Sequence, residues 1–206
     1  MADTIDAAAM KRGFLEDLAK QIGDRARKAV PKWQRKLRAL IAQSIVDSPE
    51  YDSLHGGRLQ AELGPVRPDV TINAIIAGIQ RGLLIDVSPI TVSGNDLSGY
   101  IEIMFFKKDL SEVLGTPGSS FTSEGGSFID WLKWLLTRGD EIIIKTFHFK
   151  PGRNPHGISR TGLGYMRGGY TWHVPSEFAG YENDNWLTKT LDSHSIYIVD
   201  MILEDL

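Results

Sequence analysis

The chain has 206 residues, with 23 basic and 26 acidic side chains, 42% hydrophobic residues and no cysteine. This composition is typical of a globular protein, and it excludes disulfides, thiolate nucleophiles and cysteine-ligated zinc or iron–sulfur centres. No apolar run approaches the roughly 20 residues of a membrane-spanning helix, and residues 1–13 lack the basic-then-apolar pattern of a secretory signal. We therefore expect a protein that stays in the cytoplasm or assembles from cytoplasmic material.

The formal charge of −3 conceals one basic and one acidic segment. Residues 25–38 hold seven basic side chains and no acid, whereas residues 176–206 hold seven acids and one lysine. The basic segment is compatible with nucleic-acid binding, with a solvated helix face or with a subunit contact, and the pI of about 6.0 favours the last two. The two ends of the chain are electrostatically complementary.

Apolar residues at helical spacing predict two amphipathic helices near the start, around residues 14–22 and 33–45. Pro31 lies between them, and we expect it in the first turn of the second helix, where its missing N–H costs nothing. The second helix should end near residues 47–49. The sequence thus predicts an N-terminal helical arm over residues 1–50 and an α+β domain over residues 51–206.

The next part of the chain predicts a short helix over residues 58–63 and a longer one from Asp69 to Gly82. Residues 84–92 and 99–107 are rich in β-branched and aromatic side chains, and the turn sequence between them predicts a β-hairpin. A helical turn should follow over residues 109–114.

After a Gly/Ser/Thr-rich loop over residues 116–126, Ser127 should cap a helix that ends at Gly139. Trp131 and Trp134 lie three residues apart on this helix, so they share a face that either packs in the core or anchors a subunit contact.

The last third predicts one strand from Glu141, another from Tyr170, and a closing helix that begins at Asn183 or Asp184. Residues 195–199 are also compatible with a strand. A glycine-rich loop over residues 150–169 contains six glycines and no acid, and long loops of this kind are usually functional. The expected fold is α+β, with a small antiparallel or mixed twisted sheet packed against several helices, including N-terminal amphipathic helices and a C-terminal helix.

Motifs for enzyme chemistry are weak. The sequence lacks a phosphate-binding loop, a zinc-protease motif and a nucleophile elbow. Arg167 stands where a dinucleotide-binding motif would need its third glycine. His148, His156 and His173 have no metal-ligand spacing, so we expect no metal and no cofactor. Carboxylates from Glu177 to Asp184 leave a hydrolase as an alternative, although acids at a helix N-terminus are the simpler interpretation.

Three stretches together resemble virion structural proteins of contractile-tailed bacteriophages, of the neck or tail-completion type (head–tail connectors). They are SFIDWLKWLLTRG at residues 127–139, SRTGLGYM at 159–166 and WHVPSEFAGYENDNWLTKTL at 172–191. YDSLHGGRLQAELG at residues 51–64 is consistent with the same family, and the resemblance covers roughly residues 35–195. It implies a non-enzymatic subunit without a cofactor, located in the neck or tail of the virion and assembled in the host cytoplasm.

The resemblance also implies partners. These are copies of the chain itself in a ring of roughly six or twelve, portal or adaptor proteins, tail tube or sheath proteins, and channel DNA bound without sequence preference, but no membrane. The implied assembly contacts are Arg160, Thr161, Gly162, Trp172, Pro175, Asp184, Asn185 and Trp186. The implied DNA contacts are Arg153, Arg160 and Arg167. A non-specific DNA-binding module that uses residues 25–38 remains a second alternative.

Overall fold

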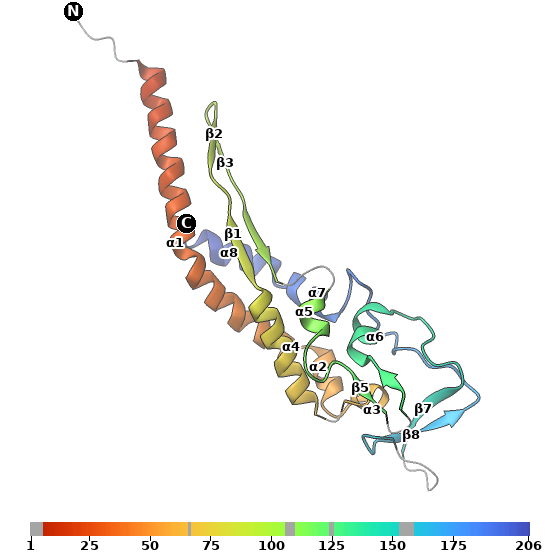
Figure 1. Cartoon of the computed structure of the whole chain (residues 1–206). Coiled ribbons are helices and arrows are strands. Elements are labelled where there is room, and N and C mark those ends of the chain that lie inside the picture. Colours follow the sequence, from red (N-terminus) through yellow and green to blue (C-terminus); the bar gives the residue numbers. More distant parts are fainter. Residues whose placement is uncertain (1–5, 66, 106–109, 124–125, 153–158) are drawn as a thin grey trace, which may run out of the picture. The chain divides into compact units, whose positions relative to one another are not determined.

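The computed structural model describes residues 6–65, 67–105, 110–123, 126–152 and 159–206. Within these ranges the chain forms eight helices and four two-stranded antiparallel sheets (Figure 1), which confirms the predicted α+β class. The described residues gather in two compact units. The first unit comes from Met1–Ala39, Leu83–Phe105 and Ile196–Leu206, and the second from Leu40–Gly82 and Phe106–Ser195. The domain boundary expected at residue 50 stays a prediction.

A single helix, α1 (Ala7–Val46), replaces the two helices expected near the start of the chain. It continues through Pro31, although a proline inside a helix removes one N–H donor and crowds the carbonyl four residues earlier. Buried side chains at intervals of four and seven residues stabilise the helix on both sides of the proline. They are Ala19, Ala26, Trp33, Leu37, Ile41 and Ile45. Tertiary packing therefore overrides the local preference for a break.

In the first unit, β1 (Leu84–Val87) pairs with β4 (Ile101–Met104), and β2 (Thr91–Ser93) pairs with β3 (Asp96–Ser98). The predicted hairpin is thus confirmed, and Figure 1 shows it as one long ribbon. Gly94 begins the turn with a φ of 60°, which suits a two-residue hairpin turn. The ribbon turns alternate residues toward one half-buried face, where Ile85 opposes Ile103.

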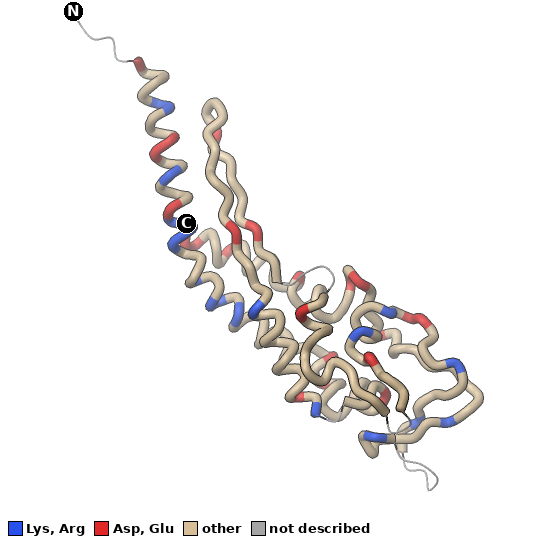
Figure 2. Tube along the Cα trace, viewed as in Figure 1, with Lys and Arg blue, Asp and Glu red and all other residues tan. Residues whose placement is uncertain are grey.

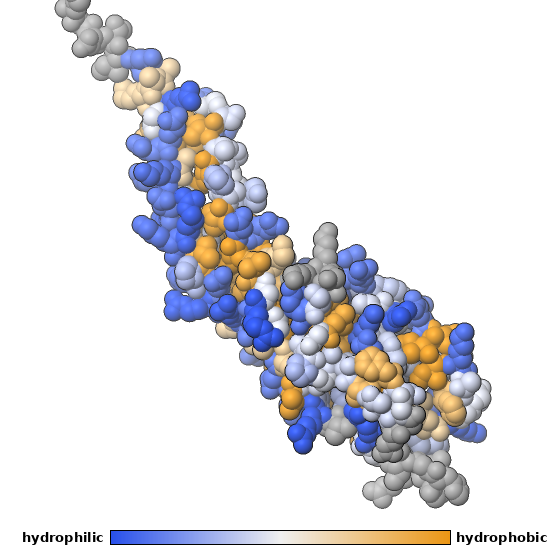
Figure 3. Space-filling view, viewed as in Figure 1, coloured by the Kyte–Doolittle hydropathy of each residue, from blue (hydrophilic) through white to orange (hydrophobic). Residues whose placement is uncertain are grey.

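This ribbon and α1 line the same shallow groove. Ile90 and Val92 of the ribbon lie at the groove together with Ala19 and Lys20 of the helix. Figure 3 shows apolar side chains reaching the surface in this part of the first unit. The apolar side chains of the ribbon are only partly covered here, since Val92 and Leu97 are half-buried.

The acidic end of the chain meets the basic segment of α1 (blue in Figure 2) inside the first unit. The Lys32 ammonium lies 2.5 Å from the Asp205 carboxylate, and the indole N–H of Trp33 donates to the same carboxylate at 3.1 Å. The Lys32 hydrogen bond outweighs partial desolvation and lowers the pKa of Asp205. Arg25 donates to the Asp205 carbonyl at 2.8 Å. The complementary charges noted in the sequence are therefore partly paired within one chain.

The remaining helices match the predictions unevenly. The helices predicted at residues 58–63 and 69–82 are confirmed, and a further helix that was not predicted, Pro49–Leu54, lies before them. Ser127 does not cap the helix that follows it, because residues 128–129 pair as a strand instead. From Pro49 to Thr137, the elements of the second unit are α2 (Pro49–Leu54), α3 (Arg58–Leu63), α4 (Pro68–Gly82), α5 (Ser111–Leu114), β5 (Phe121–Thr122), β6 (Phe128–Ile129) and α6 (Trp131–Thr137).

Part of the glycine-rich segment is a strand rather than a loop. β7 (Phe147–Pro151) pairs with β8 (Gly164–Gly168), whereas residues 153–158 lie outside the described residues. Gly164 is needed here, since a Cβ atom would meet the ring of Phe149. The strand expected from Glu141 therefore begins later, and the one expected from Tyr170 is reduced to a bridge between Trp172 and Ile144. These pairings join distant residues, which local patterns do not reveal.

The predicted closing helix is two helices, α7 (Trp186–Asp192) and α8 (Ser195–Leu203). Asn185, not Asn183 or Asp184, caps α7. Its side chain accepts hydrogen bonds from the amides of Leu187 and Thr188 at 3.0 and 3.2 Å, and the Thr188 hydroxyl accepts from the Asn185 amide at 2.8 Å. This reciprocal capping box fixes the start of the helix. The segment compatible with a strand, residues 195–199, is helical.

His55 joins the end of α2 to the first turn of α4. Its Nδ1 lies 2.9 Å from the carbonyl of Tyr51, and its Nε2 faces the carboxylate of Asp69. Burial alone would favour the neutral ring, but the hydrogen bonds to Tyr51 and Asp69 and the charge of Asp69 outweigh it and raise the pKa of His55. Because both ring nitrogens face acceptors, the imidazolium form is the one that satisfies both contacts.

Replacing Pro31 with alanine should stabilise the protein, because it restores one N–H donor and removes the clash in the middle of α1. We expect the free energy of unfolding to rise by up to about 3 kcal/mol in urea titrations. Pro31→Gly is the matched control, and it should gain less because glycine costs about 1 kcal/mol in a helix. A Pro31→Ala variant no more stable than the wild type would contradict this account of α1.

The His55 contacts predict a pH dependence of stability. Since the folded pKa lies above the ordinary value of 6.5, the stabilisation is fully present below that value and is lost as the pH rises through the folded pKa. The difference in unfolding free energy between wild type and His55→Gln should therefore shrink between about pH 6 and pH 8. Asp69→Asn should weaken the same dependence. A difference that grows with pH would refute the assignment.

Candidate functional site

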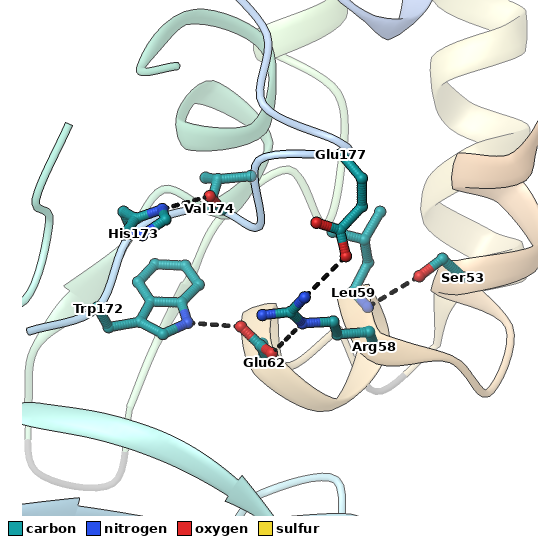
Figure 4. A network of polar contacts seen from close by, with 8 residues as sticks. All are labelled: Ser53, Arg58, Leu59, Glu62, Trp172, His173, Val174 and Glu177. Carbon is teal, nitrogen blue, oxygen red and sulfur yellow. Dashed lines mark hydrogen bonds and ion pairs between the residues drawn. The ribbon is translucent and has the colours of Figure 1, made fainter. Parts of the chain in front are cut away.

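The stretches that carry the phage resemblance meet at α3. The N-cap residue of this short helix, Gly57, has no side chain that could accept a hydrogen bond. The hydroxyl of Ser53 takes this place and accepts from the amide of Leu59 at 3.0 Å. Gly64 ends the helix in the left-handed conformation with a φ of 80°. Figure 4 shows α3 presenting two charged side chains to the segment that contains Trp172.

Glu62 is the centre of this network. Its side chain is only 10% exposed, and its two oxygens accept from Nε of Arg58 at 2.6 Å and from the indole N–H of Trp172 at 2.7 Å. A buried carboxylate is stable only when it is paired in this way. Glu62 therefore fixes the Trp172 segment to α3, and no local sequence pattern indicates this role because the partners lie 110 residues apart.

Arg58 extends the network to the start of the last resembling stretch. One of its terminal nitrogens lies 2.7 Å from the carboxylate of Glu177. The hydrogen bond to Glu62, with a smaller part from Glu177, raises the pKa of Arg58. A backbone hydrogen bond and the nearby guanidinium lower the pKa of Glu177. Arg58 and Glu177 are thus ionised at neutral pH.

Beside this network lies a hollow of about 470 Å³. The guanidinium of Arg160 lies 3.4 Å from the centre of the Phe121 ring and donates twice to the carbonyl of Gly64, at 2.6 and 3.1 Å. Among the described residues, these two bonds use only part of the five N–H donors of the Arg160 guanidinium. In the part of the chain that the structure describes, Arg160 and Glu62 line the hollow together with mainly apolar walls, which include Trp134, Ile144, Phe149 and Met166.

Three of the predicted contact residues, Arg160, Thr161 and Trp172, line this hollow. Gly162 lies in the adjoining turn with a φ of 71°. The structure therefore brings together half of the predicted assembly residues. Phe121, which stacks with Arg160, was not predicted, since nothing in its local sequence distinguishes it from a core aromatic.

The other half of the predicted assembly residues lies elsewhere. Trp186 is 2% exposed and donates its indole N–H to the hydroxyl of Ser48 at 2.8 Å. Asn185 is fully buried as the cap of α7, and Pro175 is buried as well. Only Asp184 is exposed, and it pairs with Lys189 at 3.5 Å. Pro175, Asn185 and Trp186 therefore stabilise the fold, and we do not place them on a contact surface.

The three arginines that were expected to face DNA also differ in their availability to a phosphate. Arg153 lies outside the described residues, and Arg160 spends part of its donors on Gly64. Arg167 is exposed on β8, and no ion pair joins it to another residue of the described ranges. Arg167 is thus the cation of this set that is available to a phosphate.

Among the described residues, no group of three or more histidines and carboxylates could hold a metal ion. His148 packs edge-on against Tyr170, and Nδ1 of His173 donates to the carbonyl of Val174 at 2.7 Å, whereas His156 lies outside the described residues.

The sequence matches no model of a protein family, and no characterised protein or solved structure shows significant similarity to the chain. In the described ranges no helix combines the length and apolarity that crossing a membrane requires.

A double-mutant cycle over Glu62 and Trp172 tests the centre of the network. Glu62→Ala, Trp172→Phe and the double variant should give a coupling energy of about 1.5–3 kcal/mol in chemical unfolding, since the bond is charge-assisted and mostly buried. The exposed pair Arg12 and Glu16 on α1 is the control, and its cycle should give less than about 0.5 kcal/mol. Equal coupling in both cycles would refute the special role of Glu62.

Proposed function

We propose that the chain is a virion structural subunit of a contractile-tailed phage, which acts in the neck or at tail completion by assembling into a ring. The resemblance of residues 127–139, 159–166 and 172–191 to such proteins motivates the proposal. In this role the chain is not an enzyme. It works through contacts with its own copies, with portal or adaptor proteins and with tail tube or sheath proteins.

Exposed apolar clusters are the observation that carries the proposal. Single exposed apolar residues are ordinary, but clusters mark interaction sites. In the second unit the β7–β8 ribbon exposes Phe147 and Met166 on one face, and Leu163 and Tyr170 are exposed beside its ends. Two helices of the first unit expose others. In addition, each two-stranded ribbon has unpaired edges, and such ribbons are marginal without further cover. A subunit that is covered by its neighbours tolerates these features.

The ionisation of the carboxylates also favours assembly over the hydrolase alternative. A general acid that works near neutral pH needs a raised pKa. The pKa of Glu177 is instead lowered by a backbone hydrogen bond and by Arg58, and its side chain is half-exposed. Asp184 is exposed and paired with Lys189. These acids suit a network of ion pairs better than proton transfer.

A sequence-independent contact with channel DNA is a smaller part of the proposal. Arg167, exposed on β8, is the side chain that we assign to it. Neutralising one phosphate per subunit would give an affinity that falls with salt, with a slope near one per contact.

Self-assembly is the expected behaviour of the purified chain. Native mass spectrometry and negative-stain images should show closed rings with a countable number of subunits, and the ring population should rise with protein concentration. Because the exposed clusters are apolar, rings should persist at salt concentrations that abolish DNA binding. A chain that stays monomeric at every concentration, alone and with portal and tail proteins present, would contradict the proposal.

A further inference from the structure

The outer face of α8 is apolar and uncovered. Ile196, Val199 and Leu203 recur at helical spacing and are 77%, 54% and 62% exposed. The opposite face carries Ile198, Met201 and Ile202, all buried. Apolar residues thus surround much of this helix, which is the pattern of a helix enclosed on more than one side. Within the described chain only one side is enclosed.

The first turns of α1 are uncovered as well. Every residue from Asp6 to Phe14 is exposed, so these turns lack tertiary cover in the described chain. Met10 and Phe14 lie four residues apart on one face and are 59% and 65% exposed, and Leu18 continues the same line. Anchors at this spacing are how an amphipathic helix docks on an apolar surface.

Charge distinguishes the two faces. Asp200 and Glu204 are exposed beside the apolar face of α8. Lys11 is exposed beside Met10 and Phe14 at the start of α1. Asp6 and Asp17 are exposed on the other flank of that α1 face. Two α8 faces brought together would place acids against acids, whereas the flank of α1 that carries Lys11 brings a lysine to them. Both faces are exposed in the same chain, so the chain does not cover one with the other.

We propose that the first turns of α1 from one copy dock on the outer face of α8 in the next copy. The contact seats Met10 and Phe14 against Val199 and Leu203, with Lys11 near Asp200. Because the two surfaces differ, each copy gives one helix and receives another, which is a heterologous contact that closes into a ring when the rotation fits. This inference rests on the proposed function in requiring self-association, and it adds the surfaces that meet.

Cross-linking tests the contact directly, because the chain has no cysteine of its own. Phe14→Cys carrying a size tag is mixed with untagged Val199→Cys, and a short bismaleimide is added. We expect a mixed dimer as the main product. The control mixture replaces Phe14→Cys with Lys28→Cys, which lies on an exposed part of the same helix, and should give roughly tenfold less mixed dimer or lower, as for a site outside the contact. Equal yields from the two mixtures would overturn the proposal.

Charge substitutions give an independent measurement. Phe14→Asp and Val199→Asp should each weaken association by roughly 30-fold or more, as loss of a central apolar anchor does, whereas Ser93→Asp at the ribbon tip should have no effect. Circular dichroism checks that each variant is folded. A wild type that never associates overturns the proposed function and this contact together. A wild type that forms rings, with Phe14→Asp forming them equally well, overturns the contact alone.

Discussion

The first unit depends on one carboxylate, that of Asp205. The indole of Trp33 is fully buried on α1, and a buried N–H needs an acceptor. Asp205 supplies it from the other end of the chain, and Lys32 makes the partly covered carboxylate acceptable by neutralising its charge. The bond therefore ties the last residues of the chain to the middle of its longest helix. It also uses one acid from the acidic end and leaves Asp200 and Glu204 exposed for other contacts.

The second unit repeats this arrangement at other positions. Glu62 accepts the indole N–H of Trp172 while Arg58 neutralises it, and Trp186 donates to Ser48. Each of these tryptophans combines a large buried surface with one directional bond to a segment distant in sequence. The apolar surface stabilises the contact and the hydrogen bond selects its partner. Units with thin ribbons and short helices obtain specificity from a few such anchors rather than from a large sheet.

The sequence predicts what periodicity and turn chemistry decide locally. α3, α4 and the hairpin with Gly94 in its turn follow from these signals. Pro31 misleads, because its penalty of about 3 kcal/mol is outweighed by burial along α1 that only the folded chain supplies. β8 was not predicted, because a glycine-rich sequence is typical of a loop. Its first residue is Gly164 because a side chain there would meet the ring of Phe149. The sequence predicts part of the candidate site. Arg160 and Trp172 belong to the stretches that carry the resemblance, whereas their partners Gly64 and Glu62 become evident only from tertiary contacts.

The difference between local sequence signals and tertiary contacts also explains why some predicted contact residues are buried within the chain. A tryptophan followed by helix-forming residues is typical both of a core and of an interface, and Trp186 belongs to the core because Ser48 accepts its N–H. Phe14 behaves in the opposite way, since its helical spacing predicts burial and yet it is exposed. The proposed contact between copies would cover this residue, which finds no core in its own chain. In each unit a few polar bonds of buried tryptophans fix distant segments to one another, and the exposed apolar faces are the surfaces that the proposed ring would cover.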